Sequence, residues 1–459
     1  MGELTNDIPA GLGLPLLDRE RTIARPGHSR WLVPPAALAI HLCIGQAYGF
    51  SVFNLPLTRL LGVTQSAPGD WKLSQVAVIF SVAIVFLGLS AAVFGKWLER
   101  VGPRKAMFAA ALCFGSGFIV AALGVKLHLL PLIVLGYGVL GGIGLGLGYI
   151  SPVSTLIKWF PDRPGMATGM AIMGFGGGAM VGSPLAVALM AKFATPAGTG
   201  VFEAFLVMGV VYFCFMLFGA ATVRLPAPGW KPEGWVPSPA PRKLVTSENV
   251  TADEAIKTPQ FWLLWAVLLL NVSAGIGVLQ MASPMIQETF PGVIGPAPAA
   301  GFVGLLSLFN MSGRFFWSSL SDRLGRKPTY AVYFLLGCGL YALVPSAGRL
   351  HNVGLFVACF CIIMTMYGGG FATIPAYLRD LFGTQQVGAI HGRLLTAWSL
   401  AGVVGPLLIN FVREAQIARG VPTAQSYNLT MYLLCGFLLA GFVCNALVRP
   451  VDPKHHARA

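Results

Sequence analysis

The chain alternates long apolar runs with short polar segments over almost its whole length. An α-helix needs about 20 consecutive, mainly apolar residues to cross a bilayer. Twelve runs reach that length, so we predict an all-α membrane protein with twelve transmembrane helices. The expected helices cover residues 32–56, 74–95, 106–125, 131–156, 167–191, 202–223, 261–287, 299–320, 329–347, 353–377, 389–412 and 428–448.

One polar segment is much longer than the others, and it divides the expected helices six and six. Its many prolines and its mixed charges predict a solvated linker, with one short amphipathic helix near residues 252–256. The expected domains are an N-terminal tail, an N-terminal half, the linker, a C-terminal half and a C-terminal tail, at residues 1–31, 32–223, 224–260, 261–448 and 449–459.

Composition agrees with a membrane protein, since 55% of the residues are hydrophobic and only 10% are charged. Soluble proteins carry about 25% charged residues. The net charge of +14 does not indicate nucleic-acid binding, because the basic residues lie in short clusters between apolar runs. With both termini inside, 22 of the 31 Lys and Arg residues fall in cytoplasmic segments and 7 on the other face. This excess predicts cytoplasmic termini and an inner (plasma) membrane location.

The two halves resemble each other in sequence. "GKWLERVGPRK" (95–105) follows the second expected helix, and "SSLSDRLGRKP" (318–328) follows the eighth. Matched residues keep an offset of 222 or 223 positions: Gly102 with Gly325, Phe160 with Phe382, and Pro184 with Pro406. A sustained offset predicts two homologous six-helix halves. This architecture resembles the major facilitator superfamily, which implies a substrate site near the midplane between the halves.

The repeated motif combines a glycine, an acid and several cations at the ends of expected helices. Glycine permits a tight turn, and the acid can accept hydrogen bonds from the N-terminus of a neighbouring helix. The cations supply inside charge and partners for the acids. The resemblance implies a latch at a cytoplasmic gate, while topology anchoring alone is the plainer interpretation. The candidate gate residues are Glu99, Gly102 and Arg104 in the first copy, and Asp322, Arg323, Gly325, Arg326 and Lys327 in the second.

Glycine crowds the fourth and fifth expected helices, in "GYGVLGGIGLGLGYISP" (136–152) and "GMATGMAIMGFGGGAMVGSP" (165–184). Neither segment is a phosphate-binding loop, because no strand precedes it and no Lys-Ser/Thr pair follows a GxxxxG pattern. Small residues at spacings of three and four let helices approach closely. Two interpretations stay open: surfaces that slide during transport, and tight packing without motion.

Arg314 lies inside the apolar run 299–320, where a charge is least expected. It precedes Asp322 by eight residues, about 12 Å of helix, and half of the hydrocarbon core is about 15 Å thick. An arginine near mid-membrane costs about 2.5–3.5 kcal/mol. All 17 Asp and Glu residues fall in tails, loops or the last turns of expected helices. Arg314 therefore either bonds to helix carbonyls as a structural residue or binds an anion from outside.

A guanidinium pairs with a carboxylate through two parallel hydrogen bonds, so the anion we predict is a small organic carboxylate. Aromatic and polar residues at matching depths are candidates for the rest of the substrate pocket, although a residue of this kind alone is more often a packing residue than a ligand contact. These candidates are Gln46, Tyr48, Tyr149, Tyr367 and Trp398.

A narrower resemblance covers nearly the whole chain. It lies in "IGQAYGFSVFNLPL", "IKWFPDRPGMATGMAIMGFGGGA", "KTPQFWLLW", "NMSGRFFWSSLSDRLGRK" and "LRDLFGTQQVGAIHGRLLTAW", which together resemble the oxalate/formate antiporter family. Members that exchange oxalate use an arginine on the eighth helix and a lysine on the eleventh. Arg314 matches the arginine, but Trp398 stands where the lysine is expected. One cation in place of two implies a monoanion such as formate, pyruvate or lactate.

Three further ionisable residues lie inside or close to expected helices. Arg393 is a second anion contact, an attractor on the access path or an inside anchor. His391, near the cytoplasmic end of the eleventh helix, either carries a coupling proton or lies in water at the helix end. His41, in the first helix, is another candidate proton carrier.

The sequence thus predicts a secondary active transporter of small monocarboxylates that works by alternating access and exchanges one anion for another. Exchange is expected because an empty carrier must close around an unpaired cation. The alternatives are proton-coupled uptake of such acids, export of a larger organic anion, and a carboxylate sensor that transports nothing. No enzyme, cofactor or metal site is expected, because no nucleophile–base constellation or ligand cluster is present. The expected partners are the anion and the lipid bilayer, with a monomer as the working unit.

Overall fold

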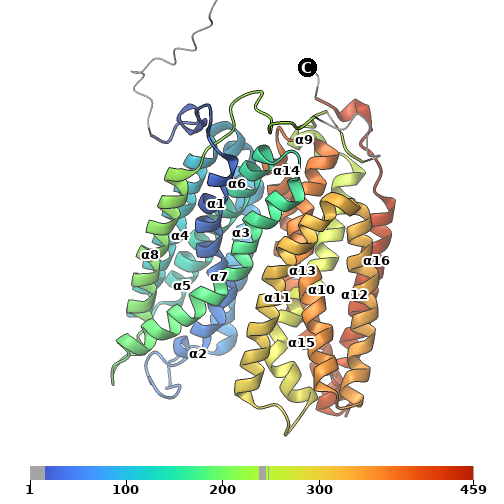
Figure 1. Cartoon of the computed structure of the whole chain (residues 1–459). Coiled ribbons are helices and arrows are strands. Elements are labelled where there is room, and N and C mark those ends of the chain that lie inside the picture. The colour runs from blue at the N-terminus through green and yellow to red at the C-terminus, as the bar shows by residue number, and fades with distance from the viewer. Residues whose placement is uncertain (1–15, 237–243, 247, 458–459) are drawn as a thin grey trace, which may run out of the picture.

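The computed structural model describes residues 16–236, 244–246 and 248–457. The parts of the expected tails and linker at 1–15, 237–243, 247 and 458–459 lie outside the described residues. Within the described ranges the chain forms helices and short turns, with no strand. Figure 1 shows two groups of helices side by side, and the C-terminal segment lies at the same end as the segment that leads into α1. The predicted all-α fold is confirmed.

The first group contains six membrane-length helical segments among the described residues. In chain order they are α1 (Pro34–Ile44), continued by the 3-10 helix η3 (Gly45–Phe53) and α2 (Asn54–Leu57); α3 (Leu73–Val101); α4 (Pro103–Lys126); α5 (Leu130–Ile133), continued by the π-helix η4 (Val134–Gly141) and α6 (Gly142–Trp159); α7 (Pro164–Phe193); and α8 (Val201–Thr222).

The linker contributes α9 (Ala252–Ala255), which confirms the short helix expected near 252–256. The second group then adds six more membrane-length segments. They are α10 (Pro259–Thr289); α11 (Pro296–Leu324); α12 (Arg326–Arg349); α13 (Val353–Phe382); α14 (Val387–Leu394), continued by α15 (Thr396–Ala418); and α16 (Asn428–Leu447).

Local sequence explains where many of these helices begin. Proline stands in the first turn of α4, α7 and α10, where its missing N–H costs no hydrogen bond. Thr258 also caps α10, because its side chain accepts a hydrogen bond from the amide of Phe261 at 3.3 Å. Asn352 caps α13 in the same way, through the amide of Leu355 at 2.9 Å.

Eleven segments of the described chain are long and apolar enough to cross a membrane. The exception among the twelve expected spans is α11, although it has 29 residues. Asn310, Arg314 and several serines dilute its apolar character. The expected span that is not apolar enough by this measure is thus the one that carries the buried cation.

The repeated motifs form tighter turns than the loops expected from the sequence. Only Gly102 separates α3 from α4, and only Gly325 separates α11 from α12. Their φ angles are +84° and +88°, in the region that disfavours any residue with a Cβ atom. The expectation that these two glycines permit a tight turn is confirmed, and it places Glu99 and Asp322 in the last turns of their helices.

The two groups meet where α7 packs against α11 and α13, and where α3 packs against α14 and α15. α7 and α11 lie side by side near the end that carries the C-terminus and diverge toward the opposite end (Figure 1). Gly165 and Gly169 of α7 lie on Ser318, since an added Cβ atom would lie 2.1 Å from the Ser318 carbonyl and hydroxyl oxygens, respectively. The close approach expected from the glycine-rich segment is present, while sliding stays a prediction.

Replacing Gly165 by alanine is expected to wedge α7 away from α11 and to lower the thermal stability of the purified protein. The clash is with a backbone carbonyl that cannot rotate aside, and overpacking of this kind costs about 1–3 kcal/mol. Gly339→Ala on α12 is the matched control, because nothing lies within 4 Å of its added Cβ atom. Equal melting temperatures for the two variants would contradict the tight contact.

Candidate functional site

Arg314 lies on α11 at the surface that faces α7, between the two groups of helices. Its side chain is fully buried. Nε donates to Oδ1 of Asn310 at 3.1 Å, and Nη1 donates to the carbonyl oxygen of Ile172 at 3.4 Å. Nη2 is buried without a hydrogen-bond partner. Among the described residues no carboxylate pairs with this guanidinium, in agreement with the sequence expectation.

Aromatic rings surround the guanidinium. Its central carbon lies 5.4 Å from the ring centre of Phe371, 5.7 Å from that of Phe175 and 5.9 Å from that of Tyr48. Phe371 comes from α13, Phe175 from α7 and Tyr48 from η3. Cation–π contacts of this kind are worth about 0.5–2 kcal/mol each, so they offset part of the burial cost but supply no hydrogen-bond acceptor.

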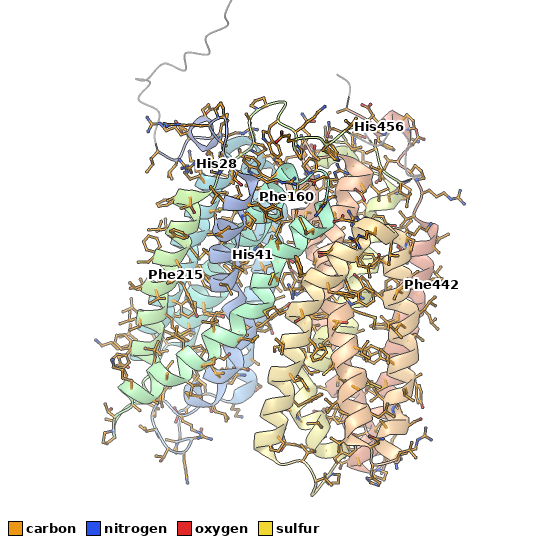
Figure 2. The ribbon with its side chains drawn as sticks, viewed as in Figure 1. His28, His41, Phe160, Phe215, Phe442 and His456 are labelled. Carbon is orange, nitrogen blue, oxygen red and sulfur yellow. The ribbon has the colours of Figure 1, made fainter. Side chains whose placement is uncertain are left out.

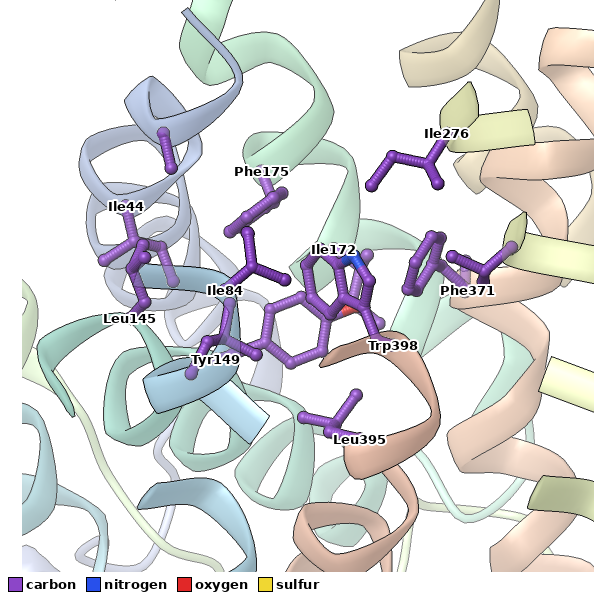
Figure 3. Close-up of a cluster of buried hydrophobic side chains, with 14 of the residues drawn as sticks. Ile44, Ile84, Leu145, Tyr149, Ile172, Phe175, Ile276, Phe371, Leu395 and Trp398 are labelled. Atoms are coloured by element: carbon purple, nitrogen blue, oxygen red, sulfur yellow. The ribbon is translucent and has the colours of Figure 1, made fainter. Parts of the chain in front are cut away.

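Trp398 forms the next wall of the same cluster, and its side chain is fully buried. Figure 3 shows it between Phe371 and Tyr149, and its ring centre lies 4.5 Å and 5.3 Å from theirs. Nε1 of Trp398 has no hydrogen-bond partner. Aliphatic side chains from both halves, including Ile84 and Ile276, flank the rings (Figure 3). Trp398 thus places an uncharged surface close to the guanidinium.

Two of the candidate tyrosines connect the halves. The hydroxyl of Tyr48 in the N-terminal group lies 3.3 Å from that of Tyr367 in the C-terminal group. The side chain of Gln46 does not join these two tyrosines, because its Oε1 accepts a hydrogen bond from Tyr137 at 3.1 Å inside the N-terminal group. The structure therefore brings Tyr48, Tyr367 and Trp398 around Arg314, while the side chain of Gln46 bonds to Tyr137.

Buried polar atoms without partners continue from the aromatic cluster. Tyr149 lies between two histidines, with ring centres 5.4 Å from His41 and 5.8 Å from His391. All three side chains are buried, and within the described ranges neither the Tyr149 hydroxyl nor any of the four imidazole nitrogens has a hydrogen-bond partner. The interpretation of His391 as a helix-end residue in water is wrong, because α13, α3 and α6 pack over its helix.

Sequence reasoning missed three side chains that contact Arg314. Asn310 lies four positions earlier in α11, one helical turn away, so its spacing was a usable signal. Phe175 and Phe371 carried no such signal. Each lies beside a run of glycines, and phenylalanines of that kind cannot be told from ordinary packing residues in a chain with 30 of them.

The acid of the second motif copy bonds to the other half. Asp322 accepts hydrogen bonds from the amides of Gly165 at 2.8 Å and Met166 at 2.9 Å, at the N-terminus of α7. Arg326 donates to Asp322 at 2.7 Å and to Asp380 at 3.0 Å. The expected contact between the motif acid and a neighbouring helix N-terminus is present, and a buried ion-pair network supports it.

The first copy repeats this arrangement with a different cation. Glu99 accepts a hydrogen bond from the amide of Gly388 at 3.0 Å, in the first turn of α14. Its ion-pair partner is Lys158 at 2.8 Å, a residue that the motif did not indicate. Each half therefore holds the other through one carboxylate and one helix N-terminus.

The remaining motif cations do not pair with these acids as expected. Arg104 donates to the carbonyl oxygens of Leu16 and Ala221, and Lys327 donates to those of Ala446 and Val448. Arg323 is exposed. Arg104 and Lys327 thus bond to backbone carbonyls of other segments and not to the motif acids.

Arg393 pairs with the linker and does not point into the aromatic cluster. It donates to Asp253 of α9 at 2.7 Å and also bonds to the carbonyl oxygen of Ala252. Asp253 forms a second ion pair with Lys96 of α3. One linker carboxylate thus joins the two groups of helices, an arrangement that agrees with an anchor, one of the three roles weighed for Arg393.

The ion pairs of Asp253 predict how this contact depends on pH. Hydrogen bonds from Lys96 and then from Arg393 lower the pKa of the Asp253 carboxyl to about 2. A lowered pKa means that this contact is fully formed above the ordinary Asp pKa of about 3.9 and is lost only as the pH falls through about 2. We expect the pH profile of transport between about 5 and 8 to keep its shape in Asp253→Asn. An inflection that disappears in that variant, but not in Asp253→Glu, would contradict this.

Comparisons with known proteins agree with this geometry. A sequence model described as Major Facilitator Superfamily matches residues 36–406. The chain is 27% identical to the oxalate:formate antiporter of Oxalobacter formigenes, covering 92% of this chain and 93% of that one. It is 26% identical to apicoplast pyruvate carrier 1 of Toxoplasma gondii, covering 85% and 78%. A crystal structure of the transporter FucP in the outward conformation superposes with a TM-score of 0.65 at 13% identity, covering 90% and 98%.

Proposed function

The chain belongs to the Major Facilitator Superfamily, and on that premise we propose that it is a secondary active transporter of small organic monocarboxylates. The family and the resemblance to oxalate/formate antiporters expected from the sequence are confirmed. The protein is thus a multi-pass membrane transporter. In this proposal its substrate is an anion such as formate, pyruvate or lactate.

The unpaired guanidinium of Arg314 carries the proposal. It is fully buried between the halves, and its Nη2 has no hydrogen-bond partner among the described residues. Burying a cation without a counter-ion is costly, so a group that arrives with one negative charge and two acceptor oxygens is strongly favoured there. A carboxylate meets both requirements.

The surroundings of Arg314 support a monoanion. Asn310 is neutral, and the nearby rings of Tyr48, Phe175, Phe371 and Trp398 offer apolar faces without a second cation. A dianion in such a site leaves one charge uncompensated. The names of two relatives support small carboxylates as the substrate class: one is an antiporter of oxalate and formate, and the other is a pyruvate carrier.

The latches support alternating access by exchange. Asp322 of α11, which bonds to α7, and Glu99 of α3, which bonds to α14, close the face that carries the C-terminus. In the proposed cycle they open to admit substrate on that side, which the Lys and Arg distribution assigns to the cytoplasm. Reorientation of the empty carrier keeps an unpaired cation buried and is slow, whereas the loaded carrier is neutral and moves readily. The proposed working unit is a monomer in the plasma membrane.

Counterflow in proteoliposomes tests the proposal. Vesicles loaded with one unlabelled monocarboxylate are diluted into the labelled acid, with pyruvate, formate and lactate taken in turn. We expect labelled substrate to accumulate only when unlabelled anion is inside. Uptake that is equal with and without internal anion would exclude obligatory exchange. No uptake, together with thermal stabilisation by the same acid, would identify a sensor.

Proton-coupled uptake is the second candidate, and the two buried histidines favour it. His41 and His391 have no hydrogen-bond partners, and they lie on either side of the Tyr149 ring. A proton that binds there can compensate the charge of a substrate anion. Uptake into empty vesicles driven by an imposed pH gradient, and abolished in His391→Gln, would favour this candidate over exchange.

Replacing Trp398 by lysine is expected to move selectivity from monoanions toward dianions. Its ring lies beside Phe175 and Phe371, both of which contact Arg314, so an ammonium there adds a second positive charge to the same site. The measurement is competition of oxalate against labelled pyruvate in the counterflow assay. Trp398→Phe is the control, since it changes the shape of the site without adding charge. Equal selectivity in both variants would show that the number of positive charges in the site does not set the choice between monoanions and dianions.

A further inference from the structure

A second basic site lies at the edge of the N-terminal group, apart from the Arg314 cluster. A cavity of about 640 Å³ opens between the segment that precedes α1 and the C-terminal end of α8. It shares no residue with the substrate site or the latches. Its lining residues are Arg21, Ile23, Arg25, His28, Leu32, Pro35, Phe218, Thr222 and Arg224.

The lining is cationic on one side. Three arginines and a histidine contribute to it, and none of the nine residues is acidic. A fourth arginine, Arg104, is buried close enough to Arg224 and Arg21 for their positive charges to repel its own. Nε of Arg104 and Nε2 of His28 are buried without hydrogen-bond partners in the part of the chain that the structure describes. Positive charges gathered in this way are stabilised by an anion with several acceptor oxygens.

The other side of the cavity is apolar and continues onto the membrane surface. Leu32 and Phe218 line the cavity and are more than half exposed, at 62% and 55%. Phe215, one turn earlier on α8, is 58% exposed. Figure 2 shows His28 at the end of the bundle and Phe215 along the outer side of α8. A ligand held here therefore has its anionic group among the arginines and an apolar part that extends along α8.

We propose that this cavity binds the phosphate headgroup of an anionic phospholipid, with an acyl chain against Phe218 and Phe215. A free phosphate ion would use the arginines but would leave the apolar wall without a partner. Arginine clusters at the ends of membrane helices attract anionic headgroups. The bound lipid then neutralises the repulsion among Arg21, Arg104 and Arg224.

Native mass spectrometry of the full chain, purified from vesicles of phosphatidylcholine with phosphatidylglycerol, tests this site. We expect one retained phosphatidylglycerol per chain, and a melting temperature that rises with phosphatidylglycerol but not with phosphatidylcholine alone. In the double variant Arg21→Gln and Arg25→Gln the retained lipid and the rise in melting temperature are both expected to disappear.

The matched control is Arg100→Gln with Arg449→Gln, two exposed arginines that follow or end other helices and do not line the cavity. This control is expected to keep both the lipid and the stabilisation. Equal losses in the two double variants would overturn the site, because they would indicate attraction by net charge alone. If inorganic phosphate stabilises the wild-type chain as strongly as phosphatidylglycerol, the cavity is a soluble-phosphate site and the lipid proposal is wrong.

Discussion

Replacing Arg314 by alanine is expected to abolish carboxylate binding and exchange. Removing one partner of a desolvated, hydrogen-bonded charge pair costs about 2–5 kcal/mol, which weakens binding roughly 30-fold to 3,000-fold. The fold is expected to survive, because the substitution removes a buried cation whose partners, Asn310 and the Ile172 carbonyl, are neutral. Counterflow of labelled pyruvate and thermal shifts with a panel of small carboxylates measure the two effects.

Arg314→Lys separates the hydrogen-bond geometry of the guanidinium from its charge, and Arg349→Ala is the control. Arg314→Lys keeps the positive charge but loses the planar pair of donors, so an intermediate affinity is expected. Arg349→Ala removes an exposed arginine at the far end of α12 and is expected to change neither readout. Stabilisation by carboxylates that is unchanged in Arg314→Ala would show that they bind elsewhere.

Replacing Asp322 by asparagine is expected to open the latch between α7 and α11. The carboxylate holds the amides of Gly165 and Met166 and pairs with Arg326, which is buried. Loss of one partner from a buried ion pair costs about 3–5 kcal/mol. Hydrogen–deuterium exchange at the N-terminus of α7 is expected to accelerate, because the same two amides lose a charged acceptor. Exchange of anions is expected to fall together with this protection.

Asp452→Asn provides the control for the latch. Asp452 is an exposed acid near the C-terminus whose partner, Lys454, belongs to the same tail. Its substitution is expected to leave the protection of α7 unchanged. If Asp322→Asn slows transport while the amides of Gly165 and Met166 stay protected, Asp322 acts on transport by another route, and the latch interpretation fails.

The latch and the substrate site are linked through one helix. α11 carries Asp322 in its last turn and Arg314 two turns earlier, and α7 contacts both positions. A movement of α7 that breaks the bonds to Asp322 also moves the Ile172 carbonyl and the Phe175 ring relative to the guanidinium. Opening of the gate and exposure of the cation are therefore expected to occur together.

The sequence alone determined the features that depend on counting and on spacing. Twelve apolar runs predicted the spans, and only α11 falls short of the apolar threshold, because of the polar residues it carries. The offset between Gly102 and Gly325 predicted two homologous halves with matching turns. The absence of acids within the runs predicted an unpaired Arg314, since a partner that is missing from every span cannot be supplied by folding within the membrane.

The tertiary structure decided which side chains meet. It selected Phe175 and Phe371 as the rings around Arg314, buried His391 and directed Arg393 to the linker. In a soluble protein the apolar stripe of a helix shows which face is inside. A membrane helix is apolar on the lipid side as well, so hydropathy cannot distinguish the two faces. Contacts between residues about 200 positions apart are fixed by the packing of these faces, which only the folded chain reveals.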